Sequence, residues 1–314
     1  IANQREAQAI VLKPRRRATR QLGGTHQSRL KGRGMEFEDV RGYQPGDDAR
    51  NNDCRVTART TVAHTKTFTE ERERPVMLLC DQRSSMYFGS RVRFKSVQAA
   101  NLASLLAWSA LRRKDRVGGL LLGPGTTREF RPRSGHRAVL TLLSGLNRMN
   151  HDLGLHVTTQ ETPLRDALAE LRRVSATGST IFLISDFHDL DQECLRQLYE
   201  LSRHNSITAI SVFDPLEREL PPAGIYCIAA PQAGDARRAA LSTSPPLSDE
   251  QVQLDTSSSG ARRQFARQAR QRAEQVRQDL QRLGLATLEV DTSEQATEAL
   301  ARLFQRARGS SRHA

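Results

Sequence analysis

The sequence predicts an α/β protein with a doubly wound, mainly parallel, Rossmann-like sheet, preceded by a small strand-rich segment. Short continuous apolar runs, of the kind buried on both faces of a parallel sheet, occur at 75–80, 179–187 and 206–214. Segments with helical apolar periodicity separate these runs. Strands that alternate with helices of ten or more residues favour repeated βαβ units, so we expect functional groups outside the carboxyl ends of the strands.

The N-terminal segment, residues 1–74, contains no long helical period. Short stretches around 34–40 and 56–71 alternate apolar and polar residues, which predicts strands. The character changes at Pro75, where the first buried run begins. We therefore expect a main domain over 75–308, with a turn-rich insertion near 232–260 and a disordered tail at 309–314.

The main domain shows its elements in a regular order. Further strands are expected at 116–123 and 286–292, and a turn at Pro124-Gly125 follows the first of them. Gly284 is expected just after the end of one helix, and Ser293 as the N-cap of the last helix. Helices are expected over 94–114, 137–147, 162–174, 194–203, 261–284 and 293–307.

The charge is strongly positive: 48 Lys and Arg residues stand against 35 Asp and Glu in a chain of 314 residues, for a net charge of +13. Residues 1–35 are markedly basic. Such a block binds nucleic acid, an anionic membrane or an acidic protein, or is simply a solvated face. Since no nucleic-acid motif or interleaved aromatic residues accompany it, we do not expect a nucleic-acid partner.

No apolar run approaches the ~20 residues that a spanning helix needs, so we expect no membrane span and a cytoplasmic location. The four cysteines show no C-x-x-C pairing, which argues against a zinc site or a disulfide framework. That usage fits a reducing compartment.

Polar residues gather where parallel strands should end. The stretch from Asp81 to Met86 follows the first strand, Thr162 opens a helix, and Ser185-Asp186 closes a later strand. Carboxylate and hydroxyl oxygens are the ligands that Mg²⁺ prefers, so these residues predict a site for Mg²⁺ or Mn²⁺. The alternative interpretation is that both carboxylates only cap turns or helices.

The order D-x-x-x-S-M, T-x-L-x-x-A-L and S-D resembles the von Willebrand factor A domain and its metal-ion-dependent adhesion site. In that family the first motif is D-x-S-x-S, the second a lone Thr and the third an Asp at a strand end. The resemblance implies metal ligands at Asp81, Ser85, Thr162 and Asp186. It also implies an open coordination position that accepts a partner's carboxylate.

The first motif departs from the family pattern at one position. Arg83 occupies the first serine position of the motif, and Ser84 lies one place late. A guanidinium beside two carboxylates could neutralise them in place of an ion, because its planar fork matches carboxylates. Alternatively, Arg83 turns to solvent and water replaces the missing hydroxyl.

A wider resemblance, from about Lys31 to Asp214, is to the bacterial domain-of-unknown-function family fifty-eight. Its Y-x-P-G-D-D-x-R motif is matched by Tyr43, Pro45, Gly46, Asp47, Asp48 and Arg50. Members pair a strand-rich segment with a von Willebrand-like domain. The resemblance implies a non-enzymatic adaptor or chaperone-like protein that acts with a MoxR-type AAA+ ATPase.

Two rival functions remain open. One is a divalent-metal hydrolase that uses Asp47, Asp48 and Asp53. The other is a nucleic-acid binder that uses the basic N-terminus and the arginine-rich helix at 261–284. The chain lacks the G-x-S-x-G elbow, and its GPGTT stretch lacks the Walker lysine. We therefore expect no catalytic residues, no organic cofactor and no small-molecule substrate.

Overall fold

The structure is a computed structural model that describes residues 35–44, 52, 54–60, 62–70, 74–152, 161–229 and 251–309. The chain divides into two compact units, and the boundary falls between Glu73 and Arg74. The smaller unit comprises Thr19–Glu73, and the larger contains Arg74–Ala314.

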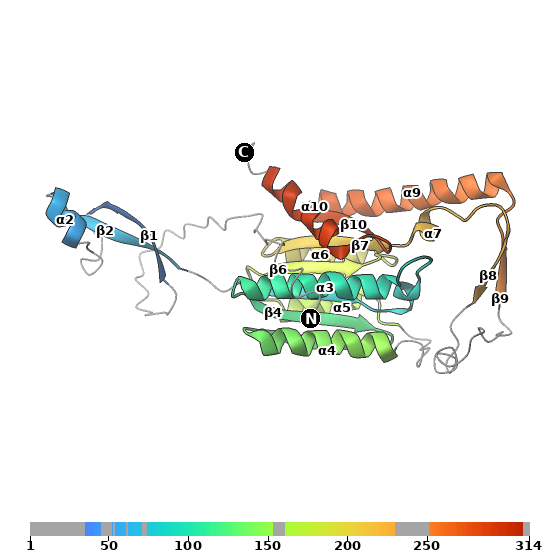
Figure 1. Cartoon of the computed structure of the whole chain (residues 1–314), viewed down its shortest axis with the longest axis horizontal. Helices are drawn as coiled ribbons and strands as arrows, with labels where there is room; N and C mark the ends of the chain where they lie inside the picture. The colour runs from blue at the N-terminus through green and yellow to red at the C-terminus, as the bar shows by residue number, and fades with distance from the viewer. Residues whose placement is uncertain are drawn as a thin grey trace. The chain divides into compact units, whose positions relative to one another are not determined.

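The larger unit is built on a six-stranded sheet in the order β10-β7-β6-β3-β4-β5 (Figure 1). All neighbouring strands run parallel except β5, which is antiparallel to β4 at one edge. The predicted doubly wound α/β class is confirmed. The strands are β3 (Pro75–Asp81), β4 (Arg116–Gly123), β5 (Thr126–Arg133), β6 (Thr180–Ser185), β7 (Ser206–Phe213) and β10 (Ala286–Asp291).

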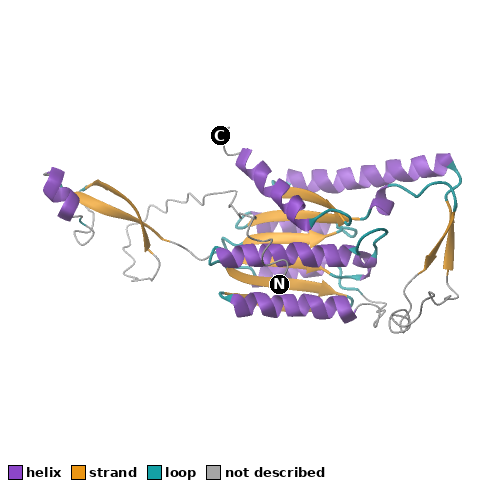
Figure 2. Ribbon diagram, viewed as in Figure 1, coloured by secondary structure: helices purple, strands orange, loops and turns teal. Residues whose placement is uncertain are grey.

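Helices cover both faces of this sheet (Figure 2). One core lies under α3 (Lys95–Arg112), α4 (His136–Asp152) and α10 (Ala296–Gly309). The opposite core lies under α5 (Leu164–Val174), α6 (Gln192–Ser202) and α9 (Ser259–Arg282). Because successive strand side chains point to opposite faces, the continuous apolar run of β3 supplies both cores.

The strand order reverses at β3. The chain leaves β3 for β4 on one side and later returns to β6 on the other side. The loops that follow β3 and β6 therefore lie next to each other at the carboxyl edge, where open α/β sheets hold their ligands.

Three local features differ from the sequence predictions, and a fourth agrees with its prediction. Strand β5 was not predicted, because its polar sequence lies at an exposed edge and shows no apolar run. The last helix begins at Ala296, and Ser293 bonds the Asp291 carboxylate instead of capping it. Within the predicted turn-rich insertion, β9 (Gln251–Asp255) pairs with β8 (Ile225–Ala229). Gly284 does follow the end of α9, with a φ of +73°.

The smaller unit pairs β1 (Met35–Gly42) with β2 (His64–Glu70) in antiparallel fashion. Between them lies α2 (Cys54–Thr60), where the alternating pattern predicted a strand. Short patterns do not separate helix from strand, and this stretch contains Ala58 and Arg59, which favour a helix. Of the helices in the described ranges, none combines the length and the apolar character that a bilayer crossing requires.

Candidate functional site

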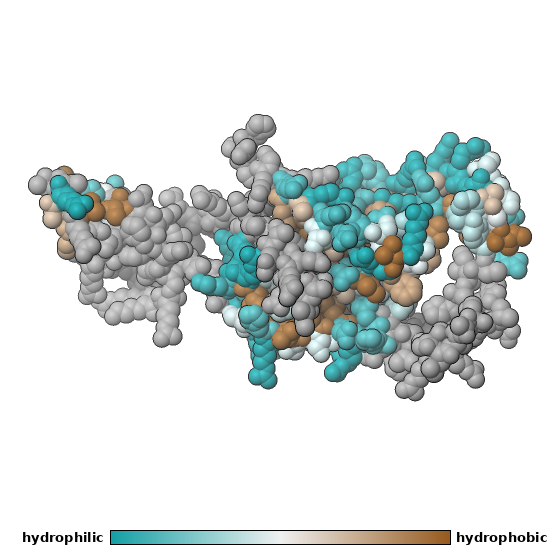
Figure 3. Space-filling model, viewed as in Figure 1, coloured by the Kyte–Doolittle hydropathy of each residue, from teal (hydrophilic) through white to brown (hydrophobic). Residues whose placement is uncertain are grey.

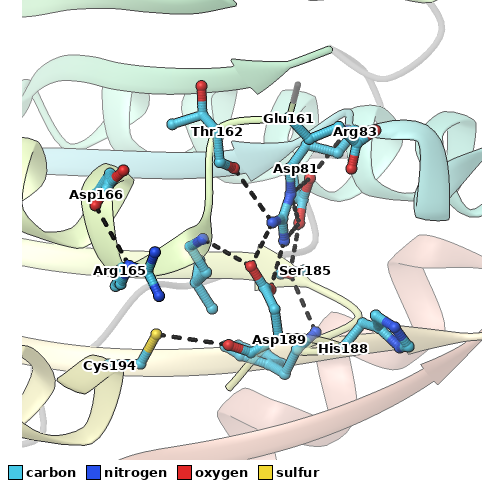
Figure 4. Close-up of polar contacts among 12 residues, drawn as sticks. Asp81, Arg83, Glu161, Thr162, Arg165, Asp166, Ser185, His188, Asp189 and Cys194 are labelled. Atoms are coloured by element: carbon cyan, nitrogen blue, oxygen red, sulfur yellow. Dashed lines mark hydrogen bonds and ion pairs between the residues drawn. The ribbon is translucent and has the colours of Figure 1, made fainter. Parts of the chain in front are cut away.

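Asp81, the last residue of β3, is the centre of the candidate site. Its side chain is completely buried, and both of its oxygens accept hydrogen bonds from Arg83 (Figure 4). Nε donates to Oδ1 at 3.1 Å and Nη2 to Oδ2 at 2.8 Å, and the Arg83 backbone N–H donates to Oδ1 at 3.0 Å. The Ser185 hydroxyl, at the end of β6, donates to Oδ2 at 2.7 Å. The chain itself therefore uses both carboxylate oxygens.

Arg83 joins three loops. Its Nη1 and Nη2 donate to the two carboxylate oxygens of Asp189, at 2.6 and 2.8 Å, in a bidentate ion pair. Nη1 also donates to the Thr162 carbonyl oxygen at 3.4 Å. Asp189 in turn accepts from the backbone N–H of Leu164, the first residue of α5. The guanidinium thus ties the loop after β3 to the loop after β6 and to the start of α5.

Burial opposes the charged form of Arg83, but the hydrogen bonds to Asp189 and Asp81 and their charges outweigh it and raise its pKa. Burial also raises the pKa of Asp81, although the bonds and charge of Arg83 act to lower it. Burial would raise the pKa of Asp189, but the hydrogen bonds from Arg83 and Leu164 lower it overall. Since every oxygen of Asp81 accepts a hydrogen bond, the carboxylate is the form that fits the site.

Lys95, the first residue of α3, is a second buried cation. Its Nζ contacts Asp186 Oδ2 at 2.9 Å and Glu217 Oε1 at 2.6 Å. Asp186 Oδ1 accepts from the backbone N–H of His188, and Ser85 hydrogen-bonds the same carboxylate. Burial opposes ionisation of both partners, but their mutual attraction prevails: the pKa of Lys95 is raised and that of Asp186 is lowered.

The structure brings the four predicted residues to one edge of the sheet, but in two separate ion-pair groups. Asp81 and Thr162 both contact Arg83, whereas Ser85 and Asp186 belong to the group around Lys95. Thr162 contributes its carbonyl oxygen, and its side chain points away from Arg83 (Figure 4).

The remaining predicted residues lie elsewhere. Ser84 is exposed at the rim, where its backbone N–H donates to Glu161 Oε1 at 2.8 Å. It begins the short 3₁₀ helix η3 (Ser84–Tyr87). Tyr43 belongs to the smaller unit and is largely exposed. Asp47, Asp48, Arg50 and Asp53 lie outside the described residues.

These side chains do not fit a divalent ion as they are arranged. An ion shared between Asp81 and a carboxylate of the neighbouring loop would need free oxygens, and the guanidinium fills that position. The alternative in which Arg83 turns to solvent is wrong, because only 4% of the residue is exposed. In the part of the chain that the structure describes, no three His, Cys, Asp or Glu side chains are grouped to hold a metal.

Sequence reasoning missed Asp189, Lys95 and Glu217. Asp189 follows the S-D motif by three residues, and a buried arginine beside Asp81 would require a second carboxylate. That requirement could have pointed to the Asp-rich loop 186–191. Lys95 and Glu217 are far apart in the chain, and no spacing rule links them.

A half-open cavity of ≈ 200 Å³ lies between α9 and the sheet, next to Asp186. Its charged side chains are paired: Arg218 with Glu289 at 2.6 Å, and Arg272 with the His188 carbonyl oxygen at 2.6 Å. A cavity whose charges are already satisfied offers a charged ligand little to bind.

The sequence matches a family model. The model of the family described as "Protein of unknown function DUF58" matches residues 39–275. Uncharacterized protein Rv1480 of Mycobacterium tuberculosis (strain H37Rv) and its counterpart Mb1516 of Mycobacterium bovis are each 28% identical over 235 residues, covering 73% of this chain and 70% of theirs.

Among solved structures, BatB from Bacteroides thetaiotaomicron is similar with a TM-score of 0.44 and 15% identity, over 75% of this chain and 99% of that one. A von Willebrand factor type A protein from Catenulispora acidiphila is similar with a TM-score of 0.34 and 15% identity, over 48% and 36% of the two chains. Since the family model spans well over half of the sequence, the chain belongs to the DUF58 family of proteins of unknown function.

Proposed function

We propose that this chain is a non-enzymatic protein-interaction module, an adaptor or chaperone-like partner of a MoxR-type AAA+ ATPase. Docking takes place at the carboxyl edge of the sheet, on the rim formed by the loops after β3 and β6. The observation that supports this most directly is the Arg83 bridge between Asp81 and Asp189, which holds three loops in one fixed arrangement. A rim that is rigid before binding loses little conformational entropy on docking.

The chemistry of the site supports a binding role over a catalytic one. A nucleophile needs an adjacent base, yet Ser85 bonds a carboxylate that Lys95 already engages. Cys80 is fully buried, and burial raises the pKa of its thiol to about 12, so it stays protonated. The rim carboxylates Asp81 and Asp186 serve as acceptors for internal cations.

Arg83 takes the place of a divalent ion in this proposal. It neutralises Asp81 and Asp189 and occupies the space between them. A buried ion pair contributes little net stability, because desolvation offsets the attraction. Its benefit here is specificity, since it selects one arrangement of the loops.

The test uses the purified full chain and the MoxR-type ATPase of the same bacterium, with affinity measured by biolayer interferometry. Ser84→Trp places a bulky ring on the exposed rim and is expected to weaken binding at least tenfold. Thr177→Trp, at an exposed position before β6 on the amino edge of the sheet, is the matched control and should bind like the wild type. Lack of binding by the wild type, or equal binding by both variants, would overturn the proposal.

A further inference from the structure

An exposed apolar surface lies beside the rim. Phe88, Val92, Phe94 and Val97 are 36%, 58%, 48% and 37% exposed, and all four come from ten consecutive residues. We call this group the apolar knuckle. Figure 3 shows brown surface where Figure 1 places the start of α3. Single exposed apolar residues are normal on a protein surface, but a group of large ones marks a contact surface.

Backbone contacts close the loop that carries the knuckle. The Lys95 N–H donates to the Phe88 carbonyl oxygen at 2.8 Å, which joins the two ends of the loop. Gly89 packs so closely that a Cβ there would lie 2.3 Å from the Arg93 carbonyl oxygen. Phe94 is the N-cap residue of α3, and Val97 lies in the first turn of that helix. The closed loop therefore brings Phe88 and Phe94, near its two ends, close together.

The same loop is anchored to the body of the larger unit. The Ser90 N–H donates to Asp214 Oδ2 at 2.8 Å, and that oxygen also accepts from the Thr292 hydroxyl at 2.7 Å. Lys95, the next residue after Phe94, is held by Asp186 and Glu217. The knuckle is thus a preformed surface connected directly to the rim site.

We propose that the apolar knuckle binds an acidic amphipathic helix of the protein partner. This inference rests on the proposed function, because it names the part of the partner that the rim recognises. An apolar helix face presents side chains at i, i+3, i+4 and i+7, a stripe that covers a compact group of this kind.

Charge specifies the acidic character of that helix. Arg91 is exposed within the knuckle loop, and it makes no ion pair with any other residue that the structure describes. The nearby acids do not offset its charge at the surface: Glu217 pairs with Lys95, and Asp214 is fully buried. The surface beside the apolar side chains is therefore positive, which favours Glu or Asp on the partner and disfavours Lys or Arg.

Two probes test the inference on the full chain. The first is a designed helical peptide with a leucine stripe flanked by Glu, compared with the same peptide carrying Lys in place of Glu. The Glu peptide is expected to shift the amide NMR signals of residues 88–97 at least tenfold more at equal concentration. Equal shifts from both peptides, or shifts confined to other residues, would contradict the inference.

The second probe is the MoxR-type ATPase. The double variant Val92→Ser/Phe94→Ser is expected to bind it at least tenfold more weakly. Leu140→Ser on α4 and Tyr199→Ser on α6 are matched controls, because each side chain is 55% exposed away from the knuckle, and both should bind normally. Arg91→Glu should weaken binding and reverse the dependence of the affinity on salt, because it reverses the charge. Arg91→Lys keeps the charge, so its affinity and its salt dependence should match those of the wild type.

The outcomes separate a failure of the proposed function from a failure of the surface inference. If the wild type does not bind the ATPase but the Glu peptide marks residues 88–97, the proposed function is wrong and the surface inference stands. If the ATPase binds the wild type and the knuckle variant equally, the inference is wrong and the function stands. A wild-type dimer in sedimentation that the knuckle variant converts to monomer would identify a second copy as the occupant and overturn the inference.

Discussion

At the scale of single residues, the unusual feature is a buried arginine between two carboxylates. Transfer of Arg83 and Asp81 out of water is costly, and their attraction offsets that cost only because nearly every donor and acceptor is matched. The pair is therefore a weak source of net stability. Removal of only one partner is destabilising, because it leaves an isolated buried charge.

Arg83→Met should lower the free energy of unfolding by about 3–5 kcal/mol, because Asp81 is left buried without its cation. Urea denaturation followed by circular dichroism measures the change. Arg173→Met is the control, since Arg173 pairs with Glu170 and Glu129 at the surface and its loss should leave the midpoint unchanged. Equal midpoints for both variants would show that the Arg83 bridge does not hold the loops.

Arg83→Ser should create a divalent-ion site that the wild type lacks, because it restores the D-x-S-x-S pattern and frees the oxygens of Asp81. Calorimetric titration with Mg²⁺ and Mn²⁺ is expected to give binding heat only for the variant. The double variant Arg83→Ser/Asp81→Asn should lose that heat. Mn²⁺ binding to the wild type, abolished by Asp81→Asn alone, would show that Arg83 does not replace the ion.

The candidate site was predicted in its location but not in its composition. Asp81 and Asp186 follow apolar runs, and the carboxyl ends of parallel strands meet at one edge, so their proximity followed from sequence. The partners of Arg83 and Lys95 could not be read in the same way. Ion pairs between distant segments leave no periodic pattern, and both orientations of Arg83 were compatible with the sequence.

At the scale of elements, one loop connects the ion-pair group around Lys95 to the exposed apolar knuckle. The loop from Phe88 to Lys95 is closed by one backbone hydrogen bond and by the tight packing of Gly89 against Arg93. A glycine at this position is needed for the close approach and not for a positive φ, since Gly89 shows none. This loop is therefore sensitive to a single added methyl group.

Gly89→Ala should destabilise the protein by about 1–3 kcal/mol and weaken partner binding, because a Cβ would collide with backbone that cannot yield without moving Phe94. Thermal unfolding and the ATPase binding assay measure the two effects. Gly260→Ala, in the first turn of α9, has its nearest contact at 3.8 Å and should be neutral or slightly stabilising. A neutral Gly89→Ala would mean that the loop is not rigid.

The elements that the sequence predicted best are those with a strong apolar signal. β3 and β6 are buried along nearly their full length, and their apolar runs predicted them. β5 was missed because an edge strand with arginine and proline avoids the apolar pattern by which strands are recognised. α2 was predicted as a strand because seven residues are too few to establish a period.

At the scale of the whole molecule, two units divide the described chain, and both hydrophobic clusters belong to the larger one, from Val76 to Leu303. The boundary coincides with the change in sequence character near Pro75, because a domain with its own core begins where apolar runs begin.

The Arg83 bridge has a consequence for control in the cell. A positive charge that is covalently part of the polypeptide cannot be removed by a chelator, diluted or exchanged. The arrangement of the rim loops that the bridge holds then does not depend on the local supply of magnesium. In the proposed function, control by metal supply is therefore not available to this rim, and we expect regulation to come from the partner, through its nucleotide cycle or its abundance.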